Sequence, residues 1–290
     1  MIKNSELILN PDGSVYHLNL KPENIASNIL LVGDQDRVEK ITSRFDSITF
    51  STQKREFKTQ TGIYKNVPIS VISTGIGPDN IDIVMNELDA LVNIDLESKK
   101  PKTTLTSLNI IRVGTSGSLQ KEIPIDSFVM SAFGLGLDNM LRSYLIEDFT
   151  DKTLEDAFIR HTNWDARKGR PYCIKASEKL LQLFDSEEVF SGFTATAGGF
   201  YGPQGRVLRL PIQDELLNNK MDNFEFNQYK ITNFEMETAA IYGLGALLGH
   251  QTLSLNAIIA NRPLGEFSQN PYQVVENLID FTLEKMINLI

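Results

Sequence analysis

The chain has few of the side chains that bind metal ions or form disulfides. Cys173 is the only cysteine in 290 residues, which excludes an intramolecular disulfide and any multi-cysteine zinc or iron–sulfur site. The three histidines, at positions 17, 161 and 250, are too far apart for an HExxH pair. We therefore expect no metal site.

Excess positive charge and long apolar runs are also missing. There are 28 Lys and Arg against 37 Asp and Glu, a net charge of −9. Nucleic acids and anionic membranes attract clustered positive charge, so neither is an expected partner. No apolar stretch reaches the roughly 18 residues of a membrane helix, and the first 13 residues lack the apolar core of a signal peptide. We therefore expect a soluble, cytoplasmic protein.

The composition is that of a globular protein, with 41% hydrophobic and 22% charged residues. Without internal repeats, low-complexity segments or a Gly/Ser linker, the chain is predicted to form a single domain over residues 1–290. Two polar stretches, residues 95–106 and 139–172, are expected to be surface insertions. The second contains the basic run ARKGR, which is expected to be a solvated loop because acidic residues crowd before it.

Short β-branched runs alternate with longer helical patterns, which favours an α/β layered fold. The apolar runs predict strands at residues 29–32, 68–73, 108–113, 128–133 and 253–260. Apolar residues at helical spacing predict helices at about 37–45, 81–91, 236–248 and 272–287.

Three predicted strands run directly into glycine-containing turns, with the sequences VGDQDR, STGIGPDN and RVGTSGS. In open α/β sheets, ligands bind beyond the carboxyl ends of strands, where backbone N–H groups face a crevice. Two of the turns have an arginine beside the glycine, Arg37 and Arg112. Arg112 interrupts an otherwise apolar strand, and a buried arginine normally requires a partner of opposite charge. These turns indicate an oxyanion site.

Several common active-site motifs are absent. There is no GxxxxGK[ST] nucleotide loop, and GIGPDN lacks the third glycine of a dinucleotide fingerprint. GTSGS has Ser118 where the hydrolase elbow GxSxG requires glycine. Glu235 and Glu237 could suggest the paired acids of a glycosidase, but acids at a helix start are common because they favour the helix dipole.

The segment NFEMETAAIYGLGALLG is rich in alanine and glycine, so its helix is expected to pack closely. Its first turn holds Met236 and Glu237 where they could face a crevice. A carboxylate beside a thioether suits a sugar, which offers hydroxyls to bond and a carbon face to cover. A capped core helix explains this segment alone equally well.

Together these segments resemble the uridine phosphorylases of the nucleoside phosphorylase-I family. The resemblance runs in order through VYHLNL, VGDQDRVEKI, KREF, STGIGPDN, RVGTSGSLQ, GFYGPQGR, NFEMETAAIYG and AIIANR. It implies a three-layer α/β/α sandwich around a mixed, partly barrel-like central sheet. It also implies reversible phosphorolysis of uridine to uracil and ribose 1-phosphate in pyrimidine salvage, catalysed by a pentosyltransferase.

The resemblance assigns roles to residues at the phosphate and ribose. The implied phosphate ligands are Gly33, Arg37, Arg112 and Thr115, together with Arg55 from the neighbouring subunit. The implied ribose contacts are Met236, Glu237 on the 2′-hydroxyl, and His17 of the neighbouring subunit on the 5′-hydroxyl. The implied partners are thus uridine, phosphate and a second copy of the chain in a homodimer with shared sites; bacterial members assemble such dimers into hexamers.

The resemblance also assigns the base pocket to Gly117, Phe200, Gln204, Arg206, Ile259 and Arg262. A glutamine amide can pair in two directions with the uracil imide, while an arginine donates to the carbonyl that gains negative charge. Arg112, Arg206 and Glu237 are the implied catalytic residues. No organic cofactor is expected, since phosphate is the co-substrate.

Three alternatives stay open. A purine nucleoside phosphorylase would carry an aspartate where this chain has Asn261 before Arg262. A nucleosidase that uses water has no need of three phosphate arginines. A non-catalytic nucleoside-binding protein on the same scaffold would be indicated by loss of Arg112 or Glu237, and both are present. The loop STGIGPDN also has GPDN where the family usually has GGPS, which argues against a monovalent-cation site at the dimer interface.

Overall fold

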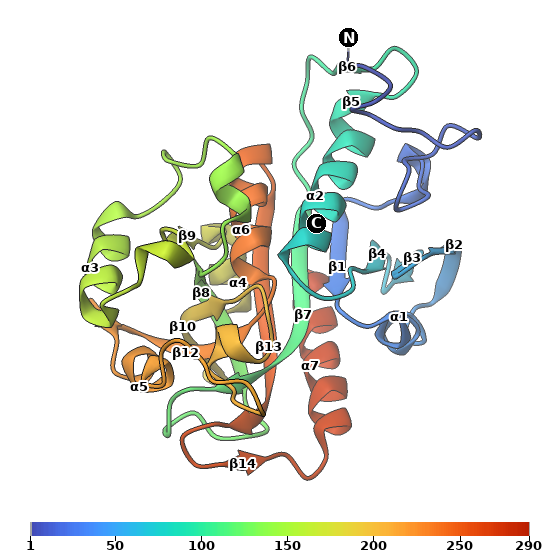
Figure 1. Cartoon of the computed structure of the whole chain (residues 1–290). Coiled ribbons are helices and arrows are strands. Elements are labelled where there is room, and N and C mark those ends of the chain that lie inside the picture. The colour runs from blue at the N-terminus through green and yellow to red at the C-terminus, as the bar shows by residue number, and fades with distance from the viewer. Residues whose placement is uncertain (1, 290) are drawn as a thin grey trace.

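Strands and helices alternate along residues 2–289, the part of the chain that the computed structural model describes (Figure 1). The α-helices are α1 (Gln35–Thr42), α2 (Pro78–Asn93), α3 (Lys152–Thr162), α4 (Glu178–Phe184), α5 (Leu217–Asp222), α6 (Thr238–Leu248) and α7 (Pro271–Met286). The strands are β1 (Asn28–Val32), β2 (Ser47–Lys54), β3 (Phe57–Tyr64), β4 (Val67–Ser73), β5 (Ile94–Asp95), β6 (Lys100–Pro101), β7 (Asn109–Ser118), β8 (Phe128–Gly136), β9 (Tyr172–Lys175), β10 (Val189–Thr196), β11 (Glu225–Phe226), β12 (Tyr229–Glu235), β13 (Gln251–Asn261) and β14 (Glu266–Phe267). Short 3-10 helices are η1 (Pro22–Asn24), η2 (Met140–Ser143), η3 (Ala166–Lys168) and η4 (Gly202–Gln204).

A mixed sheet organises the molecule. Its strand order is β11-β12-β10-β8-β13-β7-β1-β4-β3-β2. An additional antiparallel pairing of β12 with β7 closes the strands β7, β13, β8, β10 and β12 into a barrel. The outer strands β1 and β4 continue the sheet in parallel, and the antiparallel strands β3 and β2 follow them. The predicted partly barrel-like α/β fold is confirmed.

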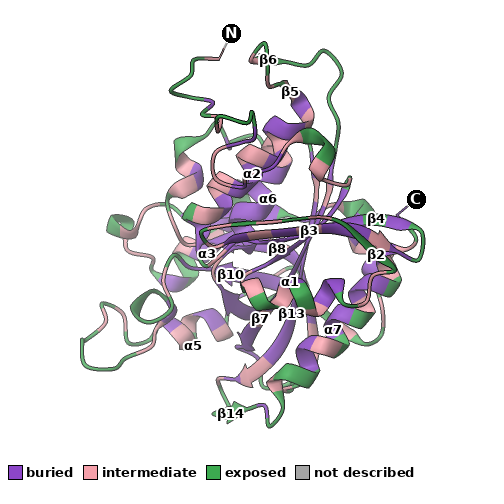
Figure 2. Cartoon of the chain, turned by 90° about the vertical axis from the view of Figure 1, so that its right-hand side faces the viewer, coloured by how far each residue is buried: buried purple, intermediate pink, exposed green. Residues whose placement is uncertain are grey.

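The central strands are apolar because helices cover both faces of the sheet. All five residues of β1 are buried, as expected for a parallel strand with no solvated face. Helix α2 packs against α6, while α1 packs on β3 and β4 and α7 packs on β13 and β7. Arg44, just after α1, pairs with Glu276 at 2.7 Å and Asp280 at 2.5 Å, both on α7. Figure 2 shows buried residues concentrated along the strands and on the covered faces of these helices.

Helix α6 lies unusually close to the sheet because small residues line it. Its residues from Thr238 to Gly245 are all buried. A Cβ atom on Gly134 of β8 would lie 2.7 Å from the Cα of Ala239, so no larger residue fits between the helix and the strand. The close packing expected from the alanine- and glycine-rich sequence is present, and it fixes the first turn of α6.

The two expected insertions differ in structure. Residues 95–106, which include most of the short β5–β6 hairpin, are largely exposed. In residues 139–172, α3 buries Leu154 and Phe158 in an aromatic cluster beside the barrel, so part of this segment is core rather than surface. Its helical spacing of apolar residues was hidden by the charges around it.

The basic run ARKGR is paired with acidic residues rather than free to hold an anion. Arg170 lies 2.8 Å from Glu155 and 2.7 Å from Asp156. Arg167 pairs with Asp165 at 2.5 Å. The acidic residues that precede the run in the sequence therefore supply its partners. Among the described residues, no helix is both long and apolar enough to cross a bilayer.

Candidate active site

A cavity of about 550 Å³ opens beside the barrel, where β1, β7 and β12 reach the start of α6. Most of the predicted site residues line it: Gly33, Arg37, Arg112, Thr115, Gly117, Phe200, Gln204, Arg206, Met236, Glu237 and Ile259. These residues come from segments far apart in the sequence, and the pairing of β7 with β1 in parallel and with β12 in antiparallel brings them together. Within the described part of the chain, no group of three or more His, Cys, Asp or Glu side chains is placed to hold a metal ion.

One end of the cavity carries unneutralised positive charge. The Arg37 side chain donates to the carbonyl of Val113 at 3.2 Å and forms no ion pair with any described residue. Burial, and then the nearby charge of Arg112, lower the pKa of Arg37. A guanidinium has five donors, so Arg37 retains most of its capacity for an oxyanion beside the backbone of Gly33 and Thr115.

Arg112 is buried in the cavity wall and pairs with two acids. It lies 2.5 Å from Glu237 and 3.4 Å from Glu235, and it donates to Asn256 at 3.0 Å. Although burial acts to lower the pKa of Arg112, the two carboxylates raise it. The partner that a buried arginine requires is thus a pair of acids. Asn256 was missed from the sequence, although a polar residue inside the run LSLNAIIA was a usable signal.

Glu235 and Glu237 have different roles despite their spacing. Glu235 accepts from the backbone N–H of Glu237 at 2.9 Å and of Thr238 at 3.1 Å, and from the Thr196 hydroxyl at 2.6 Å. It is therefore the helix cap that acids at this position normally provide.

Glu237 instead faces the cavity. One of its oxygens accepts from the Gly77 N–H at 2.7 Å, where Gly77 has φ 100° at the start of α2. Burial raises the pKa of Glu237, while Arg112 opposes that shift. The loop STGIGPDN thus contributes to the site directly through Gly77.

The other end of the cavity suits a flat polar ring. Gln204 is 1% exposed, and its side-chain oxygen accepts from Arg206 at 2.5 Å. The Arg206 guanidinium also donates to the Phe200 carbonyl at 2.6 Å and lies 3.8 Å from the centre of the Phe200 ring. Gly117, Ile259 and the unpredicted Phe234 complete an apolar wall.

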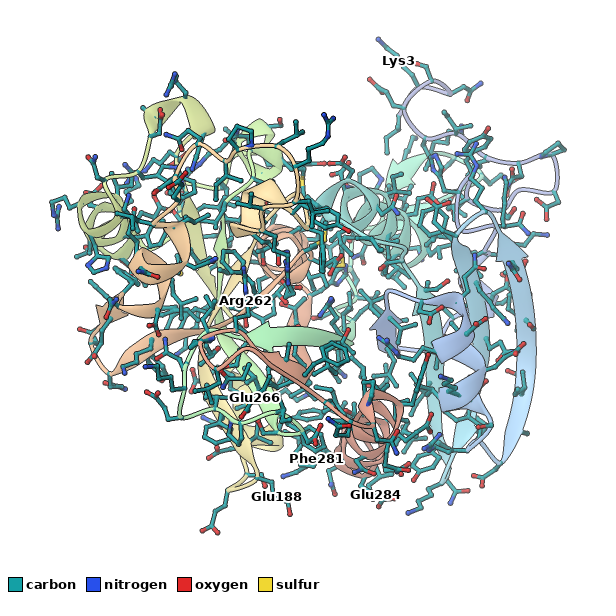
Figure 3. All side chains as sticks on the ribbon, turned by 60° about the horizontal axis from the view of Figure 1, so that its bottom comes forward. Lys3, Glu188, Arg262, Glu266, Phe281 and Glu284 are labelled. Atoms are coloured by element: carbon teal, nitrogen blue, oxygen red, sulfur yellow. The ribbon has the colours of Figure 1, made fainter. Side chains whose placement is uncertain are left out.

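Arg262, labelled in Figure 3, is not among the residues that line this cavity. It donates to the backbone carbonyl of Gln204 at 2.7 Å and its guanidinium lies 5.6 Å from the Phe234 ring. Burial and the charge of Arg206 lower the pKa of Arg262 to about 10. Its hydrogen bond helps to fix the turn that carries Gln204, so in this structure Arg262 supports the cavity wall and does not line the cavity.

His17 and Arg55 also lie outside the cavity of their own chain. Arg55 sits in the turn between β2 and β3 with φ 55°, and it is exposed. His17 contacts Glu87 of α2. Their predicted role in a neighbouring subunit's site stays a prediction.

Comparison with known proteins decides the family. Residues 28–288 match the model of the phosphorylase superfamily. The chain belongs to this superfamily. The match spans β1 to α7 and therefore every residue that lines the cavity. The predicted membership of the nucleoside phosphorylase family is confirmed, and this superfamily member is an enzyme, a pentosyltransferase.

Individual relatives resemble this phosphorylase over most of its length. A uridine phosphorylase of Thermococcus kodakarensis is 30% identical over 89% of this chain and 81% of its own. A DeoD-type purine nucleoside phosphorylase of a Geobacillus species is 27% identical over 94% of this chain and 98% of its own. A crystal structure of a Trypanosoma brucei nucleoside phosphorylase, described as showing uridine phosphorylase activity, has a TM-score of 0.87 and 29% identity, covering 97% of this chain and 99% of that chain.

Proposed function

We propose that this phosphorylase exchanges uridine and phosphate reversibly with uracil and ribose 1-phosphate. The observation that carries the proposal is the placement of Gln204 and Arg206 at one end of the cavity whose other end holds Arg37 and Arg112. A base, a ribose and a phosphate fit between these ends in that order. The uridine phosphorylase relatives from Thermococcus and Trypanosoma support the same assignment.

Pyrimidine selection rests on the polarity of the base end. Gln204 offers an amide to the uracil imide, and Arg206 offers a cation to the carbonyl that becomes negative as the bond breaks. A purine phosphorylase would need an acid at position 261 to protonate its base. Asn261 stands there, and its amide donates to the carbonyls of Gln120 at 3.0 Å and Ile123 at 2.8 Å. This residue therefore ties the loop after β7 to the end of β13 and supplies no proton.

Phosphate is the proposed nucleophile because the positive end of the cavity needs an anion. Arg37 and Arg112 hold the phosphate beneath the ribose, which is catalysis by positioning and electrostatics rather than by a protein nucleophile. Positive charge grows at C1′ in the transition state, next to the carboxylate of Glu237 and the bound phosphate. Glu237 also accepts from the 2′-hydroxyl, and Met236 covers the sugar's carbon face.

The proposed reaction also leads to proposals about the enzyme's pathway, cofactors and assembly. We propose a cytoplasmic enzyme of pyrimidine salvage that needs no organic cofactor and works as a homodimer, with His17 and Arg55 supplied across the interface. A monovalent cation is not required for any step.

An ultraviolet assay of uridine, thymidine and inosine, each with and without phosphate, tests the proposal. We expect uridine to be cleaved only with phosphate and inosine to be a poor substrate. Equal rates without phosphate would identify a nucleosidase. Faster cleavage of inosine than of uridine would favour the purine activity, which the Geobacillus relative makes the second candidate.

A further inference from the structure

The ring of His17 is held in one orientation by a carboxylate from α2. The Nδ1 atom of His17 lies 2.6 Å from Glu87. The same carboxylate accepts from the backbone N–H of His17 at 3.0 Å and of Leu18 at 2.8 Å. Glu87 therefore fixes both the ring and the turn of chain that carries it.

This arrangement determines which ring nitrogen is free. A carboxylate accepts hydrogen bonds, so Nδ1 is the nitrogen that carries a proton toward Glu87. The other nitrogen, Nε2, has no hydrogen-bond partner among the described residues. The His17 side chain is 27% exposed, and the rings of Tyr16 and Phe57 stand edge-on to it at 4.9 and 6.5 Å. Because aromatic rings flank the imidazole of His17 and Glu87 binds its Nδ1, the Nε2 atom is the nitrogen that faces outward.

The chain segment around His17 is also tied to the turn that carries Arg55. Lys54 donates to the carbonyl of Tyr16 at 2.5 Å and to the side chain of Asn10 at 2.9 Å. Since Arg55 is the next residue, His17 and Arg55 belong to one connected surface outside the cavity of their own chain. Two residues that the proposed function places in a neighbour's site thus form a single unit.

We propose that Glu87 is a positioning residue that presents Nε2 of His17 to the ribose 5′-hydroxyl in the cavity of a second copy of the chain. This inference rests on the proposed function. Glu87 touches no substrate, and its effect passes entirely through the imidazole. If Glu87 only anchored the backbone of the N-terminal segment, its loss would affect substrates with and without a 5′-hydroxyl equally.

The test compares uridine with 5′-deoxyuridine in Glu87→Gln, Glu87→Ala and His17→Ala. We expect kcat/KM for uridine to fall roughly tenfold in the Glu87 variants, the effect usual for residues that orient a functional histidine. The value for 5′-deoxyuridine should stay near that of the unmodified enzyme. Adding Glu87→Gln to His17→Ala should cause no further loss, because the two residues act as one unit.

Controls separate positioning from folding. Glu97→Gln removes the same charge at an exposed position, where the side chain has no partner among the described residues, and it should not change kcat/KM for either substrate. Glu87→Gln keeps the size of the side chain and one acceptor oxygen, so it serves if Glu87→Ala fails to fold.

Three results would overturn the proposal: unchanged uridine kinetics in folded Glu87 variants, equal losses with both substrates, or no preference for uridine over 5′-deoxyuridine in the unmodified enzyme. Failure of the unmodified enzyme to cleave either nucleoside with phosphate would instead reject the proposed function.

Discussion

Glu237 links the sugar and phosphate parts of the cavity. Its carboxylate contacts Arg112 at 2.5 Å and the Gly77 N–H at 2.7 Å, so protonation of Glu237 removes the nearer of the two counter-charges of Arg112 and leaves only Glu235 at 3.4 Å. Burial raises its pKa above the ordinary 4.5. The group is therefore expected to gain a proton while most surface carboxylates are still ionised.

This shift predicts an acid limb in the pH profile of uridine cleavage. As the pH falls through the raised pKa, Glu237 becomes neutral, and kcat/KM should decline at a pH above 4.5. Glu237→Gln should lower kcat/KM on the order of 100-fold, the scale of removing one preorganised polar group, and should abolish the limb. Steady-state kinetics from pH 4.5 to 8 would check this, with Glu97→Gln as the control. An unchanged limb in Glu237→Gln would assign it to another group.

Cys173 should be chemically inert in the folded protein. It is 1% exposed, and burial, followed by the charges of Asp151 and Glu155, raises the pKa of its thiol well above the ordinary range. Thiolate is the reactive form. A chromogenic disulfide reagent at pH 8 should react slowly with the native protein and at once in guanidinium chloride. Equal rates in both conditions would show that the thiol is accessible.

At this scale, the sequence could predict residues that sit beside glycine turns or within strong motifs. Arg37, Arg112 and Glu237 share a cavity because Arg112 lies level with the end of β1 and β12 closes the barrel against β7. The pairing of Arg112 with Asn256, and the position of Arg262 behind Gln204, depend on how β7, β13 and the 199–206 loop pack. No local pattern encodes those contacts.

At the scale of elements, the start of α6 positions Glu237, the proposed catalytic acid. Its first turn is fixed by Glu235 and by the Thr196 hydroxyl, which accepts from the Ala239 N–H at 2.9 Å. Gly134 allows that turn to rest directly on β8. The position of Glu237 therefore depends on a glycine in a different element.

Gly134→Ala should force α6 away from the sheet. The added methyl would meet backbone rather than a flexible side chain, and overpacking of this kind costs about 1–3 kcal/mol. We expect a lower melting temperature and a reduced kcat/KM. Gly198→Ala is the matched control, because its Cβ would lie no closer than 3.7 Å to any neighbour. Equal stability of the two variants would contradict the packing argument.

Several elements could be predicted from the sequence because their apolar residues form a continuous run or recur at helical spacing. The buried strands β1, β4, β7, β8 and β13 and the helices α1, α2, α6 and α7 lie where apolar patterns indicate them. Strand β2 was not predicted because it lies at the sheet edge and most of its residues are not buried. Helix α3 was hidden among charges, since its partners Arg142 and Arg170 come from outside the helix.

For the whole molecule, shared active sites predict complementation between inactive chains. His17→Ala with Arg55→Ala, and separately Arg112→Ala, should each be nearly inactive. Unfolded and refolded together, about half the dimers should be mixed, each with one intact and one doubly damaged site. Activity should then return to roughly a quarter of the unmodified value. If tagged chains confirm exchange and activity stays absent, His17 and Arg55 do not act across an interface.

The identity of the sugar product shows whether phosphate is the nucleophile. We propose that Arg37 and Arg112 hold phosphate for attack at C1′. Phosphorus-31 NMR of enzyme, uridine and phosphate should show ribose 1-phosphate forming in step with uracil. Uracil released with free ribose and no new phosphorus signal would contradict the claim.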